Sequence, residues 1–166
     1  MNNTNLQKAY FGGGCFWGVE YFFENYKGVK SAISGYMGGH IHDPGYRLVC
    51  TGTTGHIEVV EVTYDETEVT YDELVRLFFN THDCSQTNGQ GPDIGSQYLS
   101  AIFYTTPEQK EIALNVIEEI KAKGFSVATK LYSTHNTPFF AAEDYHQDYY
   151  FKTGKIPYCH SLKKIV

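Results

Sequence analysis

The strongest constraint on the fold is the irregular order in which helix-like and strand-like segments follow one another. Apolar residues recur at helical spacing in three segments: 16–26, 70–82 and 106–124. Strand-like apolar or alternating runs occupy 7–11, 31–37, 56–64 and 97–104, and 130–133 is a weaker candidate. Because strands and helices do not alternate regularly, a doubly wound parallel sheet is disfavoured. The order predicts an α+β fold, a two-layer α/β sandwich with a mixed sheet, helices on its faces and an irregular C-terminal tail.

The length predicts a single catalytic domain over residues 1–166. A chain of 166 residues can bury a continuous core without disulfides or a metal. No internal repeat or linker marks a boundary. The segment after Gly154 has little periodicity, so we expect residues 155–166 to form a mobile tail.

The charge pattern excludes two classes of partner. The chain has 13 basic and 19 acidic residues, a net charge of −6, and its Lys and Arg are scattered. The sequence shows no cluster of basic residues that could bind a nucleic-acid backbone or an anionic membrane. The start of the sequence has no secretory pattern, and no apolar run is long enough to span a bilayer. We expect a cytoplasmic monomer.

Four cysteines lie far apart in the sequence: Cys15, Cys50, Cys84 and Cys159. They lack the paired spacing of a zinc ribbon and the density of a secreted disulfide scaffold. Reactive or incidental thiols are the remaining explanations, and a buried structural role is favoured for Cys50. His56, His82 and His146 have no metal-ligand spacing, which favours packed or hydrogen-bonded roles and predicts no metal site.

Cys15 is the cysteine whose surroundings favour reactivity. It begins a predicted helix directly after three glycines, where backbone N–H groups and the helix dipole favour a thiolate. Phe16 and Trp17 cannot both point into the same core, so one is expected beside the thiol as an apolar socket. Glu58 shares a strand face with the apolar Val60. Because an apolar environment favours the protonated form of a carboxyl, this position helps Glu58 to keep its proton.

Five consecutive residues, Gly14-Cys15-Phe16-Trp17-Gly18, resemble the active-site signature of the A-type peptide methionine sulfoxide reductases. The resemblance continues in order through 52–60, 90–98 and 142–147. It implies that Cys15 is the nucleophile and Glu58 the acid. Side chains in contact with substrate are also implied: Phe16 and Trp17 around the methyl group, and Tyr46, Asp93 and Tyr98 around the sulfoxide oxygen.

The resemblance also implies a reaction. Free and peptide-bound methionine (S)-sulfoxide is reduced to methionine through a sulfenic acid on Cys15, which repairs oxidised proteins. Cys159, in a segment similar to the family's Gly-Tyr-Cys recycling motif, is expected to resolve this acid as a disulfide that thioredoxin reduces. Cys84 competes for that role. No metal or organic cofactor is implied.

Two other classes of function remain at this stage. A non-enzymatic module would hold methionine-bearing peptides in its aromatic pocket without turnover, and a Cys/His module would carry stoichiometric zinc. The sequence also departs from the family pattern at Cys84, Pro92 and Leu99, where proline, asparagine and an aromatic residue are usual. These departures concern the geometry of the loop and the peptide preference.

Overall fold

A six-stranded mixed sheet forms the centre of the computed structural model, which describes residues 5–155, 160 and 162–166. The strand order is β7-β6-β1-β3-β2-β8. The strands are β1 (Leu6–Gly13), β2 (Val29–Met37), β3 (Ile57–Asp65), β6 (Ser100–Tyr104), β7 (Lys130–Ser133) and β8 (Phe140–Ala141). Neighbours are antiparallel except β6 and β7, which are parallel. The prediction of a mixed sheet in an α+β fold is confirmed.

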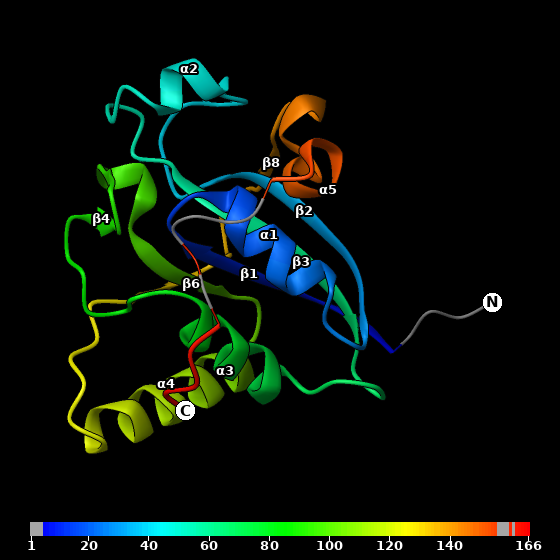
Figure 1. The fold of residues 1–166 in the computed structure, drawn as a ribbon, viewed down its shortest axis with the longest axis vertical. Helices are drawn as coiled ribbons and strands as arrows, with labels where there is room; N and C mark the ends of the chain where they lie inside the picture. The colour runs from blue at the N-terminus through cyan, green and yellow to red at the C-terminus, as the bar shows by residue number, and fades with distance from the viewer. Residues whose placement is uncertain (1–4, 156–159, 161) are drawn as a thin grey trace.

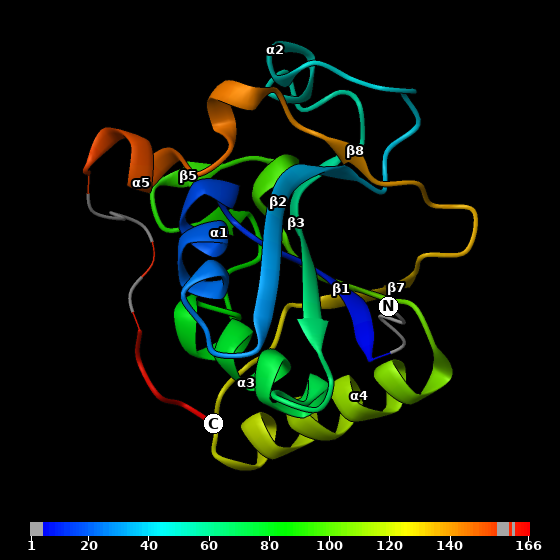
Figure 2. The same ribbon diagram turned by 90° about the vertical axis from the view of Figure 1, so that its right-hand side faces the viewer.

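Three helices pack on one face of this sheet, as Figures 1 and 2 show. They are α1 (Phe16–Glu24), α3 (Tyr71–Thr81) and α4 (Pro107–Ala122). Shorter elements stand at the ends of the strands: α2 (Tyr46–Val49), the pair β4 (Gly89–Gln90) and β5 (Asp93–Ile94), the 3₁₀ turns η1 (Ser96–Tyr98) and η2 (Asp144–His146), and α5 (Tyr149–Thr153). No helix in the described part of the chain combines the length and apolar character needed to cross a bilayer.

Strand alternation divides the buried side chains between the two faces of the sheet. On the helical side, Phe11 stacks on Phe23 with ring centroids 4.8 Å apart and contacts Phe78 at 5.1 Å. Burying a phenylalanine of this kind stabilises the fold by roughly 1.5–3 kcal/mol. Val60 belongs to this cluster, whereas Val59 belongs to the smaller cluster on the opposite face. The period of two therefore directs Glu58 toward the helical layer.

Local capping sets the starts of the two longer helices as the sequence predicts. The Thr70 side chain accepts a hydrogen bond from Glu73 N, and the Glu73 carboxylate accepts one from Thr70 N, which completes a capping box. Thr106 accepts from Gln109 N, directly before a helix that begins with Pro107. Both caps satisfy N–H groups that would otherwise have no partner.

Two segments differ from the sequence-based assignment. The strand predicted over 97–104 begins only at Ser100, because the preceding residues form the turn η1. The aromatic and acidic residues over 139–151 predict one short helix, but the structure divides this segment into β8, η2 and α5. The Gln147 side chain accepts a hydrogen bond from Ser34 N and donates one to Ser34 O, which ties this segment to β2. Asp148 adopts a left-handed conformation with φ of 55°, and this conformation interrupts the helix.

The described residues of the tail make specific contacts with the domain. His160 is buried, and its Nε2 lies 2.6 Å from Gly13 O. Further along, Asn80 accepts hydrogen bonds from the N–H groups of Ile165 and Val166 and donates to Val166 O. The mobility expected for residues 155–166 stays a prediction. Cys159 lies outside the described residues.

Candidate active site

Cys15 stands at the junction between β1 and α1. It is the N-cap of α1 rather than its first helical residue, and its carbonyl accepts hydrogen bonds from Gly18 N at 3.2 Å and Val19 N at 3.5 Å. The side chain is 7% exposed. The thiol therefore lies at the positive end of the helix, where unpaired backbone N–H groups gather.

Gly14 brings the backbone just before Cys15 against the loop that carries β4 and β5. Its φ is +91°, and a Cβ there would lie 2.6 Å from the Cβ of Gln90. Gln90 is itself fixed, because its amide accepts from Asp83 N at 2.7 Å and donates to Asp83 O at 2.8 Å. Only glycine fits both the conformation and the space.

Glu58 lies beside the start of the same helix. Its Oε1 accepts a hydrogen bond from Phe16 N at 3.1 Å, and the residue is 1% exposed. Burial raises the pKa of Glu58 from 4.5 to about 8; the Phe16 N–H opposes this rise and the charge of Asp93 adds to it. Oε2 is buried without a hydrogen-bond partner among the described residues. At pH 7 a pKa of about 8 leaves roughly nine-tenths of this carboxyl protonated.

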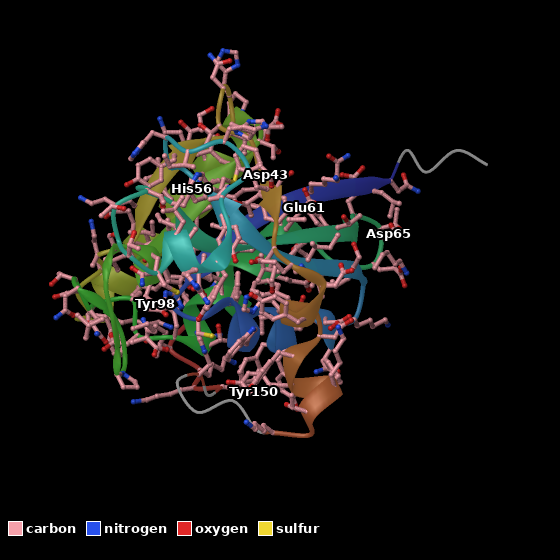
Figure 3. The ribbon with its side chains drawn as sticks, turned by 90° about the horizontal axis from the view of Figure 1, so that it is seen from above. Asp43, His56, Glu61, Asp65, Tyr98 and Tyr150 are labelled. Atoms are coloured by element: carbon pink, nitrogen blue, oxygen red, sulfur yellow. The ribbon has the colours of Figure 1, made fainter. Side chains whose placement is uncertain are left out.

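Two tyrosines and Asp93 surround this carboxyl. Burial, followed by smaller effects that include the charge of Glu58, raises the pKa values of Tyr46 and Tyr98, so both hydroxyls remain hydrogen-bond donors. The charge of Asp93 acts on both Glu58 and Tyr98, and the charge of Cys15 also acts on Tyr98. Figure 3 shows Tyr98 close to α2, the helix that begins with Tyr46. The structure thus brings five of the predicted residues together.

Cys50 borders this group, contrary to the prediction of a buried structural cysteine. It is exposed at the end of α2, and its side chain hydrogen-bonds Tyr46 and Tyr98. Partial burial raises the pKa of its thiol, against the effect of the Tyr46 hydrogen bond. The prediction was wrong because α2 is a single turn that stands beyond the end of the sheet (Figure 1), and Cys50 is its C-cap.

The side chains of Phe16 and Trp17 point in different directions, because they are adjacent residues of one helix. Phe16 is 0% exposed and lies in the main core, with its ring 5.6 Å from that of Tyr36 and 6.4 Å from that of Tyr46. Trp17 is half-buried, and its indole stacks on Tyr149 at 3.7 Å with an interplanar angle of 6°. Of the two aromatic residues that follow Cys15, Trp17 is therefore the one that stays partly accessible.

His146 and Tyr149 fix the Trp17 indole, and the sequence did not single out either residue for this role. Trp17 Nε1 donates to His146 Nδ1 at 3.0 Å. Since Nδ1 accepts, a neutral His146 carries its proton on Nε2, which is buried without a hydrogen-bond partner among the described residues. Burial lowers the pKa of His146, which favours this neutral form. A packed or hydrogen-bonded role was expected for His146, and both are confirmed.

Glu143 is a further residue that sequence reasoning missed. Its carboxylate accepts hydrogen bonds from the Tyr36 hydroxyl at 2.9 Å and from Tyr46 N at 3.0 Å. Burial alone would raise the pKa of Glu143, but the hydrogen bonds, chiefly that from Tyr46 N, lower it overall. The sequence indicated Glu143 only through its place in segment 142–147, which resembles the family pattern. That resemblance does not identify Tyr46, which is almost a hundred positions away, as its partner.

The surroundings of Cys84 differ from those of Cys15. It is 3% exposed, its Sγ lies 3.7 Å from Ser126 O, and burial raises the pKa of its thiol. It borders a hollow of about 430 Å³ whose lining includes neither Cys15 nor Glu58. These surroundings do not favour a reactive thiolate.

Together, the fold and the site define an oxidoreductase-type thiol site. A cysteine at a helix start, a buried protonated carboxyl and an aromatic wall lie at one end of an α+β sheet. The model of the family described as "Peptide methionine sulfoxide reductase" matches residues 7–165. The chain belongs to this family, and it is an oxidoreductase that reduces methionine sulfoxide in a thiol-dependent reaction.

Individual relatives cover nearly the whole chain. "Peptide methionine sulfoxide reductase MsrA" of Nautilia profundicola is 49% identical over 154 residues, 93% of this chain and 88% of the relative. Mxr1 from Saccharomyces cerevisiae in reduced form superposes with a TM-score of 0.89 at 30% identity, covering 98% of this chain and 94% of that one. Mxr1 in complex with Trx2 superposes with a TM-score of 0.63 at 20% identity, covering 98% and 93%.

Proposed function

We propose that Cys15 attacks the sulfur of methionine (S)-sulfoxide, free or in peptides, while Glu58 protonates the sulfoxide oxygen. The observation that carries this proposal is the buried Glu58 carboxyl, held by Phe16 N–H one residue after the nucleophile. A sulfoxide oxygen leaves only when protonated, whereas the attacking sulfur must be a thiolate. The site supplies an acid with a pKa of about 8 beside a cysteine at a helix N-terminus.

The binding roles follow from the same arrangement. Trp17, together with Phe16, contacts the methyl group, and the hydroxyls of Tyr46 and Tyr98 donate to the sulfoxide oxygen. Burial keeps Glu58 protonated, and the negative charge of Asp93 adds to this effect. The pocket offers apolar walls to the methyl group and hydrogen-bond donors to the sulfoxide oxygen, so it favours one orientation of the substrate.

The electrons balance in two steps. In the first, the Cys15 sulfur is oxidised to a sulfenic acid, the substrate sulfur is reduced by the same two electrons, and methionine leaves. In the second, the Cys159 thiol attacks the sulfenic sulfur, water is released and a disulfide forms. His160 supports this pairing, since the residue that follows Cys159 is docked on Gly13, two residues before Cys15.

Thioredoxin is the proposed reductant of that disulfide, in keeping with the Mxr1 relative that has been solved with Trx2. A monomer acting in the cytoplasm and repairing oxidised proteins completes the proposal. Size-exclusion chromatography with light scattering tests the monomer, and cell fractionation tests the location.

Single-turnover reduction of racemic methionine sulfoxide tests the mechanism. The parent should form one methionine per protein from the S epimer without added reductant. Cys15→Ser should form none, and Glu58→Gln should react roughly 10²–10⁴ times more slowly, the usual effect of removing a positioned acid. Consumption of the R epimer alone would contradict the stereochemistry. Saturable binding without product would instead indicate a peptide-binding module.

A further inference from the structure

Glu143 joins the short helix α2 to the central sheet. Its Oε2 accepts a hydrogen bond from Tyr46 N at 3.0 Å, and its Oε1 accepts one from the Tyr36 hydroxyl at 2.9 Å. Tyr36 lies on β2 and is 0% exposed, whereas Tyr46 is the first residue of α2. The exposed Tyr145 hydroxyl adds a longer contact to Oε2, at 3.3 Å. Figure 2 shows the segment after β8 beside α2, so Glu143 connects this helix to a buried strand residue.

The backbone of Tyr46 needs an acceptor from outside its own helix. The first N–H groups of a helix have no partner within the helix. The N-cap of α2 is Gly45, which has no side chain that could act as a cap. A helix of four residues also has too few internal hydrogen bonds to be stable by itself. The position of Tyr46 therefore depends on the hydrogen bond to Glu143.

The opposite end of Tyr46 carries its hydroxyl, which faces the active site. The Tyr46 ring lies 6.4 Å from the ring of Phe16 and 4.3 Å from that of His146, measured between centroids. The hydroxyl hydrogen-bonds Cys50, and the charge of Glu58 acts on it. Because the tyrosine ring is rigid, a shift of the backbone at position 46 also moves this hydroxyl.

Glu143 can accept two hydrogen bonds at once because it is ionised. Burial alone would raise its pKa, but the hydrogen bonds, chiefly that from Tyr46 N, lower this pKa below its ordinary value. A carboxylate accepts through both oxygens, whereas the amide of a glutamine accepts through its oxygen and donates through its nitrogen. Glutamine at position 143 has nearly the same shape, but its single oxygen cannot replace both carboxylate oxygens. One of the contacts to Tyr36 and Tyr46 would be lost.

We propose that Glu143 is a positioning residue for the reduction of the sulfoxide, because it holds Tyr46 in the place from which its hydroxyl donates to the sulfoxide oxygen. This inference rests on the role of Tyr46 in the proposed function and deepens it. Glu143 acts through Tyr46 and does not touch the reacting atoms. A displacement of about 1 Å in a reacting group can slow a reaction by roughly a hundredfold, so a hydrogen bond to the backbone at this point has a catalytic effect.

Single-turnover reduction at saturating methionine sulfoxide tests the proposal. Glu143→Gln should slow the formation of methionine by roughly tenfold, and by no more than Tyr46→Phe does. The dissociation constant of the sulfoxide should change by less than about threefold, because the hydroxyl acts chiefly as charge develops on the oxygen. Alkylation of Cys15 by iodoacetamide, followed by peptide mapping, should proceed at the parental rate. Glu111→Gln, an exposed change on α4, is the control and should match the parent in all three measurements.

A double-mutant cycle separates positioning of Tyr46 from a general structural effect. In the Tyr46→Phe background, Glu143→Gln should slow the step by less than about twofold, because the hydroxyl that it positions is absent. In the Tyr98→Phe background, its effect should be at least as large as in the parent. If Glu143→Gln reacts at the parental rate while Tyr46→Phe is slow, or if its effect is equal in all three backgrounds, the positioning role is refuted and the proposed function stands. If Tyr46→Phe itself reacts at the parental rate, the role of Tyr46 in the proposed function fails, and the positioning role fails with it.

Discussion

Glu58→Gln is expected to make the stability of the protein less sensitive to pH between pH 5 and pH 8. Glutamine has the shape of the protonated carboxyl and can still accept the hydrogen bond from Phe16 N. It cannot ionise. The substitution therefore removes a titration from the folded state while leaving its packing in place.

The magnitude follows from the raised pKa of Glu58, about 8 in the folded protein against an ordinary value of 4.5. Because the folded pKa is higher, its contribution to stability is fully present below pH 4.5 and is lost as the pH rises through 8. Each unit of pKa difference corresponds to about 1.4 kcal/mol, so the total is roughly 5 kcal/mol, of which roughly 3–4 kcal/mol is lost between pH 5 and pH 8. The residue is almost fully buried, so solvent screening does not reduce this figure much.

Urea unfolding followed by circular dichroism at pH 5, 6, 7 and 8 measures the effect. The free energy of unfolding of Glu58→Gln, minus that of the parent, should grow by roughly 3–4 kcal/mol across this range. Glu111→Gln, exposed on α4, is the matched control and should run parallel to the parent. If the curve of Glu58→Gln is also parallel to that of the parent, Glu58 is already ionised at pH 5, and the assignment of a protonated acid fails.

Three further changes test other parts of the structure. Cys159→Ser should keep one turnover per enzyme but lose cycling with thioredoxin, whereas Cys84→Ser should match the parent; a Cys15–Cys84 disulfide as the main product in peptide mapping would reverse this assignment. Trp17→Ala should lower the ratio of catalytic efficiencies for methyl over ethyl sulfoxides by about tenfold, and an unchanged ratio would remove Trp17 from the methyl pocket. Asn80→Ala removes three hydrogen bonds to the tail and should lower the free energy of unfolding in urea by about 2–3 kcal/mol. The control Asn115→Ala, on the exposed side of α4, should lower it by less than about 1 kcal/mol. Equal losses would mean that the tail contacts do not stabilise the fold.

The sequence by itself determined the features that depend on near neighbours along the chain. Thr70 and Thr106 cap their helices through residues three positions away, so the pattern was sufficient to place both starts. The period of two predicted that Glu58 shares a strand face with Val60, and the structure shows that this face is the one covered by helices. The glycines before Cys15 likewise predicted a tight turn into a helix.

Only the tertiary structure decided the features that rely on contacts between distant segments. The Trp17–His146 and Tyr46–Glu143 hydrogen bonds join residues 129 and 97 positions apart, and no local spacing encodes such pairs. The left-handed Asp148 divided a segment whose composition favoured one helix, since its N–H is held by Glu20. The exposure of Cys50 was decided in the same way. Burial and electrostatic effects depend on all the elements that lie around a group, whereas helix propensity and capping depend on a few successive residues. The raised pKa of Glu58 therefore follows only from the packing of the sheet against α1.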